Sequence, residues 1–307
     1  MTKNKTIILV LSILGFSFNG CKAEEIIPVV KPPVAGDVDV HVTTANKSML
    51  FTSVPLNFNT KPNMAIETTI NMNPAEKYQE IDGFGAAITG STCYNLLKMT
   101  QANRTKLLKE AFDPVSGMGY SYIRISIGCS DFSLEEYTCC DQTGIENFAI
   151  HELDKRDLFP ILKEIIAINP TLKILASPWT CPRWMKVNNL TELKPYNSWT
   201  SGQLNPAYYQ DYATYFVRFI QEMATEGFHI DAVTIQNEPL NRGNSASLYM
   251  SWQEQAAFVK SALGPKFTAA GISTKIVAFD HNFNYDNIQD QISYPVKMYA
   301  DPEVAKY

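Results

Sequence analysis

The sequence lacks several features that would place the protein in large functional classes. It has no Cys-x-x-Cys or His-rich spacing of the kind that binds zinc, and no Gly-x-x-x-x-Gly-Lys-Ser/Thr loop for phosphate. It also lacks an excess of basic residues, since 26 Lys plus Arg face 31 Asp plus Glu, giving a net charge of −5. This balance argues against a nucleic acid or an anionic membrane surface as the main partner, and it is compatible with a neutral substrate such as a sugar.

The composition is that of a folded globular protein. Hydrophobic residues make up 45% of the 307 residues and charged residues 19%, which is too apolar for a disordered chain. The length allows either two domains or one α/β barrel.

The N-terminus has the pattern of an export signal. Lys3 and Lys5 precede the apolar run 7–18, which is shorter than the about 20 residues that a membrane-spanning helix needs. We predict a signal peptide over residues 1–20, and the Gly20-Cys21 junction resembles a bacterial lipobox, with Cys21 as the lipidated residue. The alternative is an ordinary cleaved signal with an incidental cysteine. The proline-rich segment 21–37 is then a tether, and the protein is expected to be a surface-exposed bacterial outer-membrane lipoprotein that meets the membrane through its lipid anchor only.

The five cysteines after Cys21 cannot all form pairs with one another. They are Cys93, Cys129, Cys139, Cys140 and Cys181. A loop disulfide from Cys129 to Cys139 or Cys140 is one alternative in an oxidising compartment. The other is that several of them are small buried hydrophobic residues.

Strand-like and helix-like segments alternate along most of the chain. Residues 38–78 hold a few strands outside the main repeat, at 38–43 and 65–72. Short apolar runs, typical of strands buried on both faces, occur at 122–128, 172–179, 232–236 and 276–279. Helical patterns occupy 104–112, 156–168, 206–226 and 252–263, and the aromatic stripe of 206–226 is interpreted as a core-facing surface. This alternation predicts a parallel sheet, either a barrel or a doubly wound sheet.

The residues that follow the strands favour the barrel. Polar and aromatic residues follow each run, at 126–131, 177–180, 236–239 and 280–282. A barrel builds its active site at this end of its strands. Gly83-Phe84-Gly85-Ala86-Ala87 is expected to follow the first strand, but it lacks the third glycine of a dinucleotide-binding loop. We therefore predict a (β/α)8 TIM barrel, with no metal and no organic cofactor.

One strand ends in Asn237-Glu238-Pro239, which suggests acid–base chemistry. A carboxyl group at a barrel mouth, beside an amide and walled by tryptophan, can remain protonated near neutral pH and act as a general acid. Taken alone, Asn-Glu-Pro is a polar turn closed by proline. Three further motifs at neighbouring strand ends favour the functional interpretation.

These motifs together resemble glycoside hydrolase family 30, the retaining β-glycosidases that include glucosylceramidases and β-1,6-glucanases. The matching segments run from about residue 40 to the end, namely 83–85, 123–125 with 129–133, 175–182, 233–239 and 301–307. The resemblance implies a (β/α)8 barrel over residues 79–307 with an appended side β-sandwich, to which the strands of 38–78 belong.

The resemblance also implies roles for individual residues. Glu238 is the acid/base of a double displacement, and Asn237 hydrogen-bonds the 2-hydroxyl of the sugar. Asp131 grips outer hydroxyls and Trp179 walls the sugar pocket; the alternatives are a turn or cap residue for Asp131 and a core aromatic for Trp179. Arg124 is assigned as a nucleophile-orienting residue; the alternative is that it forms a structural ion pair. Asp280 and His281 are assigned as substrate-binding residues that line the cleft. Glu222, Glu226 and Glu254 fall on helices and are expected to be solvated.

The sequence departs from the family in one respect. The family's nucleophilic carboxylate follows its seventh strand, whereas five barrel strands can be counted before residue 307, so we expect a truncated barrel without its nucleophile. The leading hypothesis is a glucosylceramidase-like β-glucosidase acting on a β-glucoside, either a glucan oligosaccharide or glucosylceramide. The alternatives are an endo-β-1,6-glucanase, a catalytically inactive glycan-binding lipoprotein, and a xylan-acting relative.

Overall fold

The computed structural model describes residues 36–58, 71, 73–282 and 288–307. The predicted signal peptide and Cys21 lie outside the described residues, as do nearly all of the tether and of the predicted strand at 65–72. Within the described residues no helix is long and apolar enough to cross a membrane.

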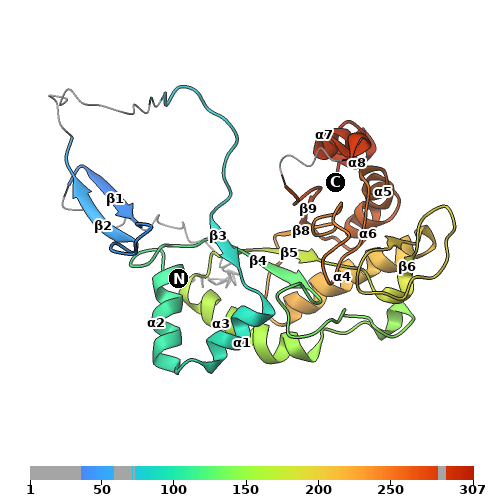
Figure 1. Ribbon diagram of the computed structural model, residues 1–307, viewed down its shortest axis with the longest axis horizontal. Helices are drawn as coiled ribbons and strands as arrows, with labels where there is room; N and C mark the ends of the chain where they lie inside the picture. Colours follow the sequence, from blue (N-terminus) through green and yellow to red (C-terminus); the bar gives the residue numbers. More distant parts are fainter. Residues whose placement is uncertain (1–35, 59–70, 72, 283–287) are drawn as a thin grey trace, which may run out of the picture.

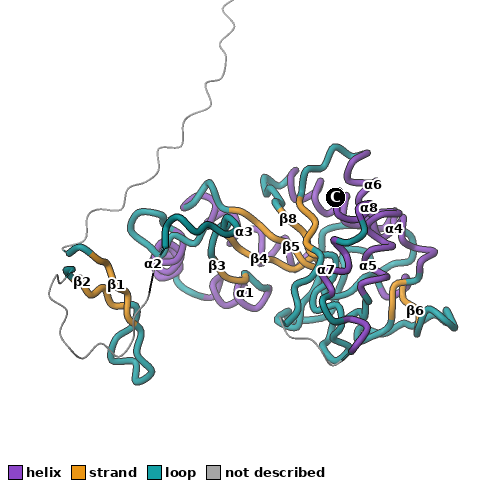
Figure 2. The backbone as a smooth tube through the Cα atoms, turned by 90° about the horizontal axis from the view of Figure 1, so that it is seen from above, coloured by secondary structure: helices purple, strands orange, loops and turns teal. Residues whose placement is uncertain are grey.

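A small antiparallel hairpin precedes the main sheet. Strand β1 (Val38–Val42) pairs with β2 (Thr52–Leu56), and Figures 1 and 2 show the hairpin lying apart from the parallel sheet. Strand β1 confirms the predicted strand at 38–43. A side sandwich over residues 38–78 stays a prediction, because the described part of this segment contains one pair of strands.

The main sheet has five parallel strands, the number counted in the sequence. They are β3 (Gly85–Ala87), β4 (Tyr122–Ile127), β5 (Lys173–Pro178), β8 (Ala232–Thr234) and β9 (Lys275–Val277), and they are hydrogen-bonded in that order. The prediction that the first of them ends before Gly83 is wrong, because Gly85–Ala87 itself pairs with the next strand. A doubly wound sheet reverses its strand order at a switch point. Here the spatial order follows the chain order throughout, as in part of a (β/α)8 barrel.

The strand bounds differ from the predicted ones mainly at the carboxyl ends. Strands β4 and β5 match their predicted runs within two residues at each end, and their central isoleucines Ile123, Ile125 and Ile174 are 1% exposed. Strand β8 ends at Thr234 and β9 at Val277, earlier than predicted. The residues after these ends leave the sheet, which frees their side chains to form a site.

Helices follow the strands and pack on the sheet; α1 to α4 lie below it in the view of Figure 1. The α-helices are α1 (Gly90–Lys98), α2 (Gln101–Phe112), α3 (Phe159–Ile168), α4 (Tyr209–Thr225), α5 (Trp252–Phe258), α6 (Gly264–Ala269), α7 (Tyr294–Tyr299) and α8 (Pro302–Ala305). Two π-helical turns, η2 (Asp154–Leu158) and η5 (Val259–Leu263), lead into α3 and α6. The remaining elements are the 3-10 turns η1 (Ile145–Asn147), η3 (Arg183–Met185), η4 (Pro206–Tyr208) and η6 (Gln289–Gln291), and the short strand pair β6 (Lys186–Val187) and β7 (Gln203–Leu204).

The aromatic stripe of α4 forms core, as predicted. Five of its apolar side chains at helical spacing are at most 2% exposed, namely Tyr212, Tyr215, Phe216, Phe219 and Met223. The rings pack on one another, with Tyr212 and Phe216 at a centroid distance of 5.1 Å. Burial of such large aromatic surfaces is the main force that holds α4 on the sheet.

The cysteines follow the second alternative of the sequence analysis. Cys93, Cys129, Cys139, Cys140 and Cys181 are all buried free thiols. Burial raises the pKa of Cys93, Cys129 and Cys181 to about 12. The thiolate is the reactive form, so these residues act as small apolar side chains.

The prediction that Glu254 is solvated is wrong. Its side chain is 5% exposed because it forms the capping box of α5, accepting a hydrogen bond from the Ser251 amide at 2.8 Å. Gln203 Nε2 donates to its other oxygen at 2.8 Å. Burial raises the pKa of Glu254, while the hydrogen bonds from Ser251 and Gln203 act to lower it. Glu226, by contrast, is exposed as expected and pairs with Lys163.

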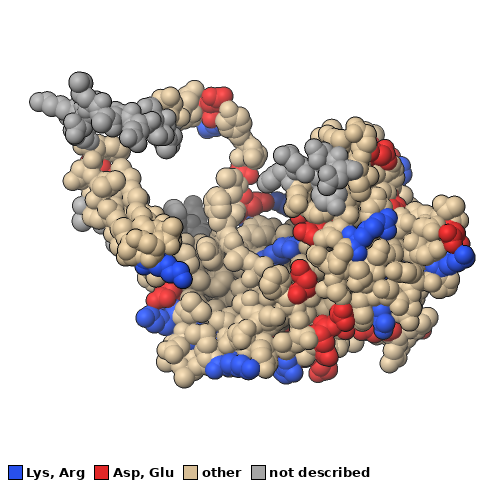
Figure 3. All heavy atoms as spheres, in the orientation of Figure 1, with Lys and Arg blue, Asp and Glu red and all other residues tan. Residues whose placement is uncertain are grey.

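Acidic and basic side chains are interspersed over the face shown in Figure 3, where they do not gather into a continuous basic surface. Most ion pairs in the described residues lie at this kind of exposed position, as Lys155–Glu152 and Lys306–Glu303 do. Exposed pairs of this kind contribute about 0–1 kcal/mol each.

Candidate active site

A cavity opens at the carboxyl ends of β3, β4, β5 and β8. Its volume is about 390 Å³, within the size range of small-molecule sites. It is lined by Ala87, Thr89, Thr92, Arg124, Asp131, Phe132, Trp179, Asn237, Glu238 and Asn244. The structure therefore brings five of the predicted site residues to one cavity, namely Arg124, Asp131, Trp179, Asn237 and Glu238.

Glu238 lies four residues beyond the end of β8 and has an unusual backbone. Its backbone φ angle is +41°, in the left-handed region that residues other than glycine rarely adopt. The Asp280 Oδ1 atom accepts the Glu238 N–H at 2.8 Å and holds this backbone in place. The carboxylate is half-buried and lines the cavity.

Arg124, in the middle of β4, connects residues at or just beyond the carboxyl ends of three other strands. Its Nη2 atom donates to Asp280 Oδ2 at 2.7 Å, to Asn237 Oδ1 at 2.8 Å and to Ser177 Oγ at 2.9 Å. Asp280 and Arg124 form a salt bridge in which the Asp280 side chain is 12% exposed. Because charge-assisted hydrogen bonds are short and strong, this network fixes the strand ends relative to one another.

The network also orients the Asn237 amide. Its Oδ1 atom accepts the Arg124 hydrogen bond, which turns the NH₂ group away from Arg124. The Asn237 backbone N–H donates to Pro178 O at 2.8 Å, which ties the end of β8 to the end of β5. The amide thus offers the cavity a fixed hydrogen-bond donor, the group needed to bind a sugar hydroxyl oxygen.

Trp179 forms an apolar wall of the cavity. It is 7% exposed and packs with Cys129, Tyr137 and Ala246, so it is both a cavity wall and part of a small core. The Arg124 guanidinium lies 4.6 Å from the centre of the Trp179 ring. The buried indole N–H has no hydrogen-bond acceptor among the described residues, and a buried donor of this kind is favourable only when a ligand or water accepts from it.

Asp131 stands on the side of the cavity formed by the loop after β4. Its side chain is exposed and lies beside Phe132, while the neighbouring Ser130 hydroxyl accepts the Phe132 N–H at 3.1 Å. An exposed carboxylate at a cavity rim can accept hydrogen bonds from sugar hydroxyls without first losing a protein partner.

Asp280 and His281 follow β9 but are not among the residues that line the cavity. Both Asp280 oxygens accept hydrogen bonds from the protein, Oδ1 from Glu238 and Oδ2 from Arg124. Burial lowers the pKa of His281, and the negative charges of Glu238 and Asp280 oppose that change. The substrate-binding role predicted for the two residues stays a prediction.

Sequence analysis missed two residues that contact Glu238. Asn241 Nδ2 donates to Glu238 Oε2 at 2.7 Å, and Asn244 Nδ2 donates to the same oxygen at 3.2 Å. Both belong to the turn after Pro239. The available signal was the clustering of two asparagines and a glycine directly after the Asn-Glu-Pro motif.

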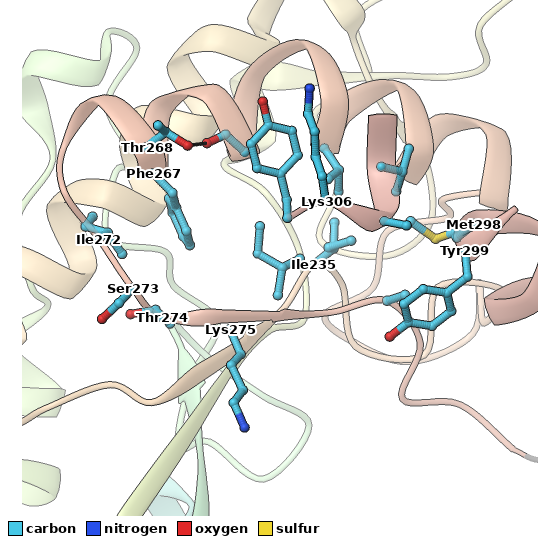
Figure 4. A pocket seen from close by; sticks show the side chains of 17 residues that line it. Ile235, Phe267, Thr268, Ile272, Ser273, Thr274, Lys275, Met298, Tyr299 and Lys306 are labelled. Carbon is cyan, nitrogen blue, oxygen red and sulfur yellow. Dashed lines mark hydrogen bonds between the residues drawn. The ribbon is translucent and has the colours of Figure 1, made fainter. Parts of the chain in front are cut away.

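A second cavity lies between β9 and helices α6 and α8. Its volume is about 470 Å³, and Figure 4 shows Ile235, Phe267 and Met298 around it, with the Lys275 side chain pointing away. No carboxylate is among its lining residues, so it offers no acid–base pair. Nor do the described residues contain a cluster of His, Cys, Asp or Glu that could hold a metal ion.

A carboxyl group, a fixed amide and an arginine thus surround a tryptophan-walled cavity at the mouth of parallel strands, the end of the sheet at which barrel enzymes build their sites. The family comparison agrees, since residues 81–307 match the glycosyl hydrolase family 30 TIM-barrel domain. The chain therefore belongs to glycosyl hydrolase family 30.

Relatives within the family differ in their substrates. The endo-1,6-beta-D-glucanase of Neurospora crassa is 34% identical over 239 residues, which cover 76% of this chain and 48% of that protein. The lysosomal acid glucosylceramidase of Mus musculus is 28% identical over 251 residues, covering 78% of this chain and 46% of that protein. The chain thus spans about half the length of these curated relatives.

A solved structure is more similar. The endo-beta1,6-glucanase BT3312 is 61% identical, with a TM-score of 0.82, over 90% of this chain and 59% of the BT3312 chain. This similarity extends the family assignment to the arrangement of the elements in space.

Proposed function

We propose that the complete gene product is a retaining endo-β-1,6-glucanase in which Glu238 is the acid/base. Glu238 at the cavity carries the proposal, because glycosidic oxygen is a poor leaving group unless a positioned acid protonates it. The 61% identity to an endo-beta1,6-glucanase supports the β-1,6 linkage over the glucosylceramide substrate that the sequence analysis placed first.

In this mechanism the sugar lies against Trp179 with its 2-hydroxyl near the Asn237 amide. Asp131 accepts hydrogen bonds from outer hydroxyls at the rim. Glu238 protonates the departing oxygen while a carboxylate nucleophile attacks C1, and Glu238 then deprotonates the water that releases the sugar. Arg124 holds Asn237 in place, and its predicted role in orienting the nucleophile is part of this proposal.

The test is to incubate the complete gene product with soluble β-1,6-, β-1,3- and β-1,4-glucans and with glucosylceramide. We expect new reducing ends from the β-1,6-glucan only, with the β-anomer formed first in an NMR time course. The Glu238→Gln variant should lose this activity, whereas Glu226→Gln, at an exposed position at the end of α4, should retain it. Ceramide release would instead support the glucosylceramidase hypothesis, and an α-anomer first would contradict the retaining mechanism.

An inactive glycan-binding lipoprotein is the second candidate. The open cavity with its unpartnered indole N–H is the observation that favours it. Isothermal titration with β-1,6-linked glucose oligosaccharides separates the two: binding without any new reducing ends from the wild-type protein would support the binder.

A further inference from the structure

Two amide groups contact the same oxygen of Glu238. Asn241 Nδ2 lies 2.7 Å and Asn244 Nδ2 3.2 Å from Oε2. An amide NH₂ group donates hydrogen bonds and cannot accept a proton in one. The oxygen that they share is therefore held as an acceptor.

The orientation of the Asn241 amide is fixed by its other contacts. Its Oδ1 atom accepts the Gly243 N–H at 2.7 Å, and its backbone N–H donates to Glu238 O at 2.8 Å. Exchanging the amide oxygen and nitrogen would bring two donors together at Gly243 and two acceptors together at Glu238. The donor group of Asn241 thus faces Glu238.

We propose that Asn241 is a positioning residue for Glu238: it holds Oε2, with support from Asn244, and leaves Oε1 as the oxygen that carries the catalytic proton. This inference rests on the proposed acid/base role of Glu238. The proton passes from Oε1 to the glycosidic oxygen as the C1–O bond breaks and its electron pair moves to that oxygen. The nucleophilic carboxylate of the retaining mechanism forms the new bond to C1. In the second half of the cycle Oε1 takes a proton from the water that attacks C1, while the bond between C1 and the nucleophile breaks and its electron pair returns to the carboxylate.

Asn241 is a cleaner test than Asn244. Asn244 lines the cavity and can contact the sugar directly, whereas Asn241 is not among the lining residues. Its side chain reaches Glu238 and Gly243, so the Asn241→Asp variant, which keeps an acceptor for Gly243, isolates the contact with Glu238. Arg242 provides the control in the same turn, because its guanidinium lies 3.7 Å from the centre of the Tyr249 ring and donates to Ser201 Oγ at 3.4 Å.

The experiment compares Asn241→Ala, Asn241→Asp and Arg242→Ala in the complete gene product. The substrates are β-glycosides of gentiobiose with an activated 2,4-dinitrophenyl group or an unactivated alkyl group. Hydrogen bonds to charged groups are stronger than those between neutral groups, so loss of the Asn241 contact should lower kcat/KM on the alkyl glycoside about tenfold. The whole decrease should appear in kcat, and KM should stay unchanged. On the activated glycoside, which needs no proton, the loss should stay below about twofold. Asn241→Asp keeps the shape and the Gly243 contact but turns an acceptor toward Oε2, so its loss should match that of Asn241→Ala.

Three outcomes would overturn the inference. They are equal losses on both leaving groups, full activity of Asn241→Asp on the alkyl glycoside, and the same selective loss in Arg242→Ala. The Glu238→Gln variant, assayed in parallel, separates this inference from the proposed function. If Glu238→Gln loses activity selectively on the alkyl glycoside and the Asn241 variants do not, the positioning role alone fails; if Glu238→Gln keeps full activity on it, both fail.

Discussion

Stability should depend on the protonation of Asp154, a carboxyl group behind the tryptophan wall. Asp154 lies in η2, is 7% exposed and accepts a hydrogen bond from the Tyr137 hydroxyl at 2.6 Å. Tyr137 in turn packs with Trp179. Burial raises the pKa of Asp154 to about 7, with the Tyr137 hydrogen bond acting in the opposite direction.

The sign and size of the effect follow from linkage. The folded state holds the Asp154 proton more tightly than the unfolded state, so the stabilisation is complete below about pH 4 and is lost as the pH rises to about 7. A difference of about three pH units corresponds to a loss on the order of 4 kcal/mol over this window. Asp154→Asn keeps an acceptor for Tyr137 and carries no charge, so it should escape this loss.

The assay is thermal unfolding of the complete gene product and of Asp154→Asn, followed by circular dichroism between pH 4 and pH 8. The variant should match or fall slightly below the wild type at pH 4 and exceed its Tm by several degrees at pH 8. Tyr137→Phe removes the opposing hydrogen bond and should extend the pH-dependent loss to higher pH. Glu135→Gln, which neutralises an exposed carboxylate, serves as the control. A Tm difference between Asp154→Asn and wild type that stays constant with pH would refute the reasoning.

Three further predictions concern catalysis, the salt bridge and the N-terminus. Glu238→Gln should lose about 10²–10⁴-fold on substrates with poor leaving groups, and azide should restore turnover of activated glycosides as a β-glycosyl azide; loss without rescue, measured by product NMR, would reassign Glu238 to binding. Asp280→Ala leaves Arg124 without its carboxylate and should lower the free energy of unfolding by about 3–5 kcal/mol, measured by urea denaturation. The control is Asp290→Ala, at an exposed position. Equal losses in the two variants would contradict a stabilising role for the salt bridge. Cys21→Ser should move the protein from the membrane fraction to the soluble fraction if Cys21 is lipidated, and unchanged detergent partitioning would contradict the lipobox hypothesis.

Periodicity was enough to predict the sheet and the main helix. Strands β4 and β5 each contain an apolar run in which most residues are buried, so the run marks each strand directly. Helix α4 repeats its aromatic residues at helical spacing. Strands β8 and β9 end earlier because hydrogen bonding stops where the chain turns toward the cavity, and apolar content alone does not mark that point.

Residue type predicted which strand ends form the site but not how they are held. The sequence predicts that Arg124 orients the nucleophile or joins an ion pair, but three acceptors from different strand ends converge on it only in the folded chain. The sequence does indicate the capping role of Glu254, because Ser251-x-x-Glu254 is the capping-box pattern. The burial of Asp154 depends on Tyr137, 17 residues away in sequence, and no local pattern indicates it.

The left-handed backbone at Glu238 has a consequence for selection. A residue with a β-carbon in this conformation costs roughly 1–2 kcal/mol relative to one in a common region, and glycine or asparagine would relieve part of that cost. A screen for thermostability alone would therefore favour Gly or Asn at position 238 and eliminate the acid. Lineages that no longer need hydrolysis should drift in the same direction, which makes position 238 a marker for distinguishing active descendants of this fold from inactive ones.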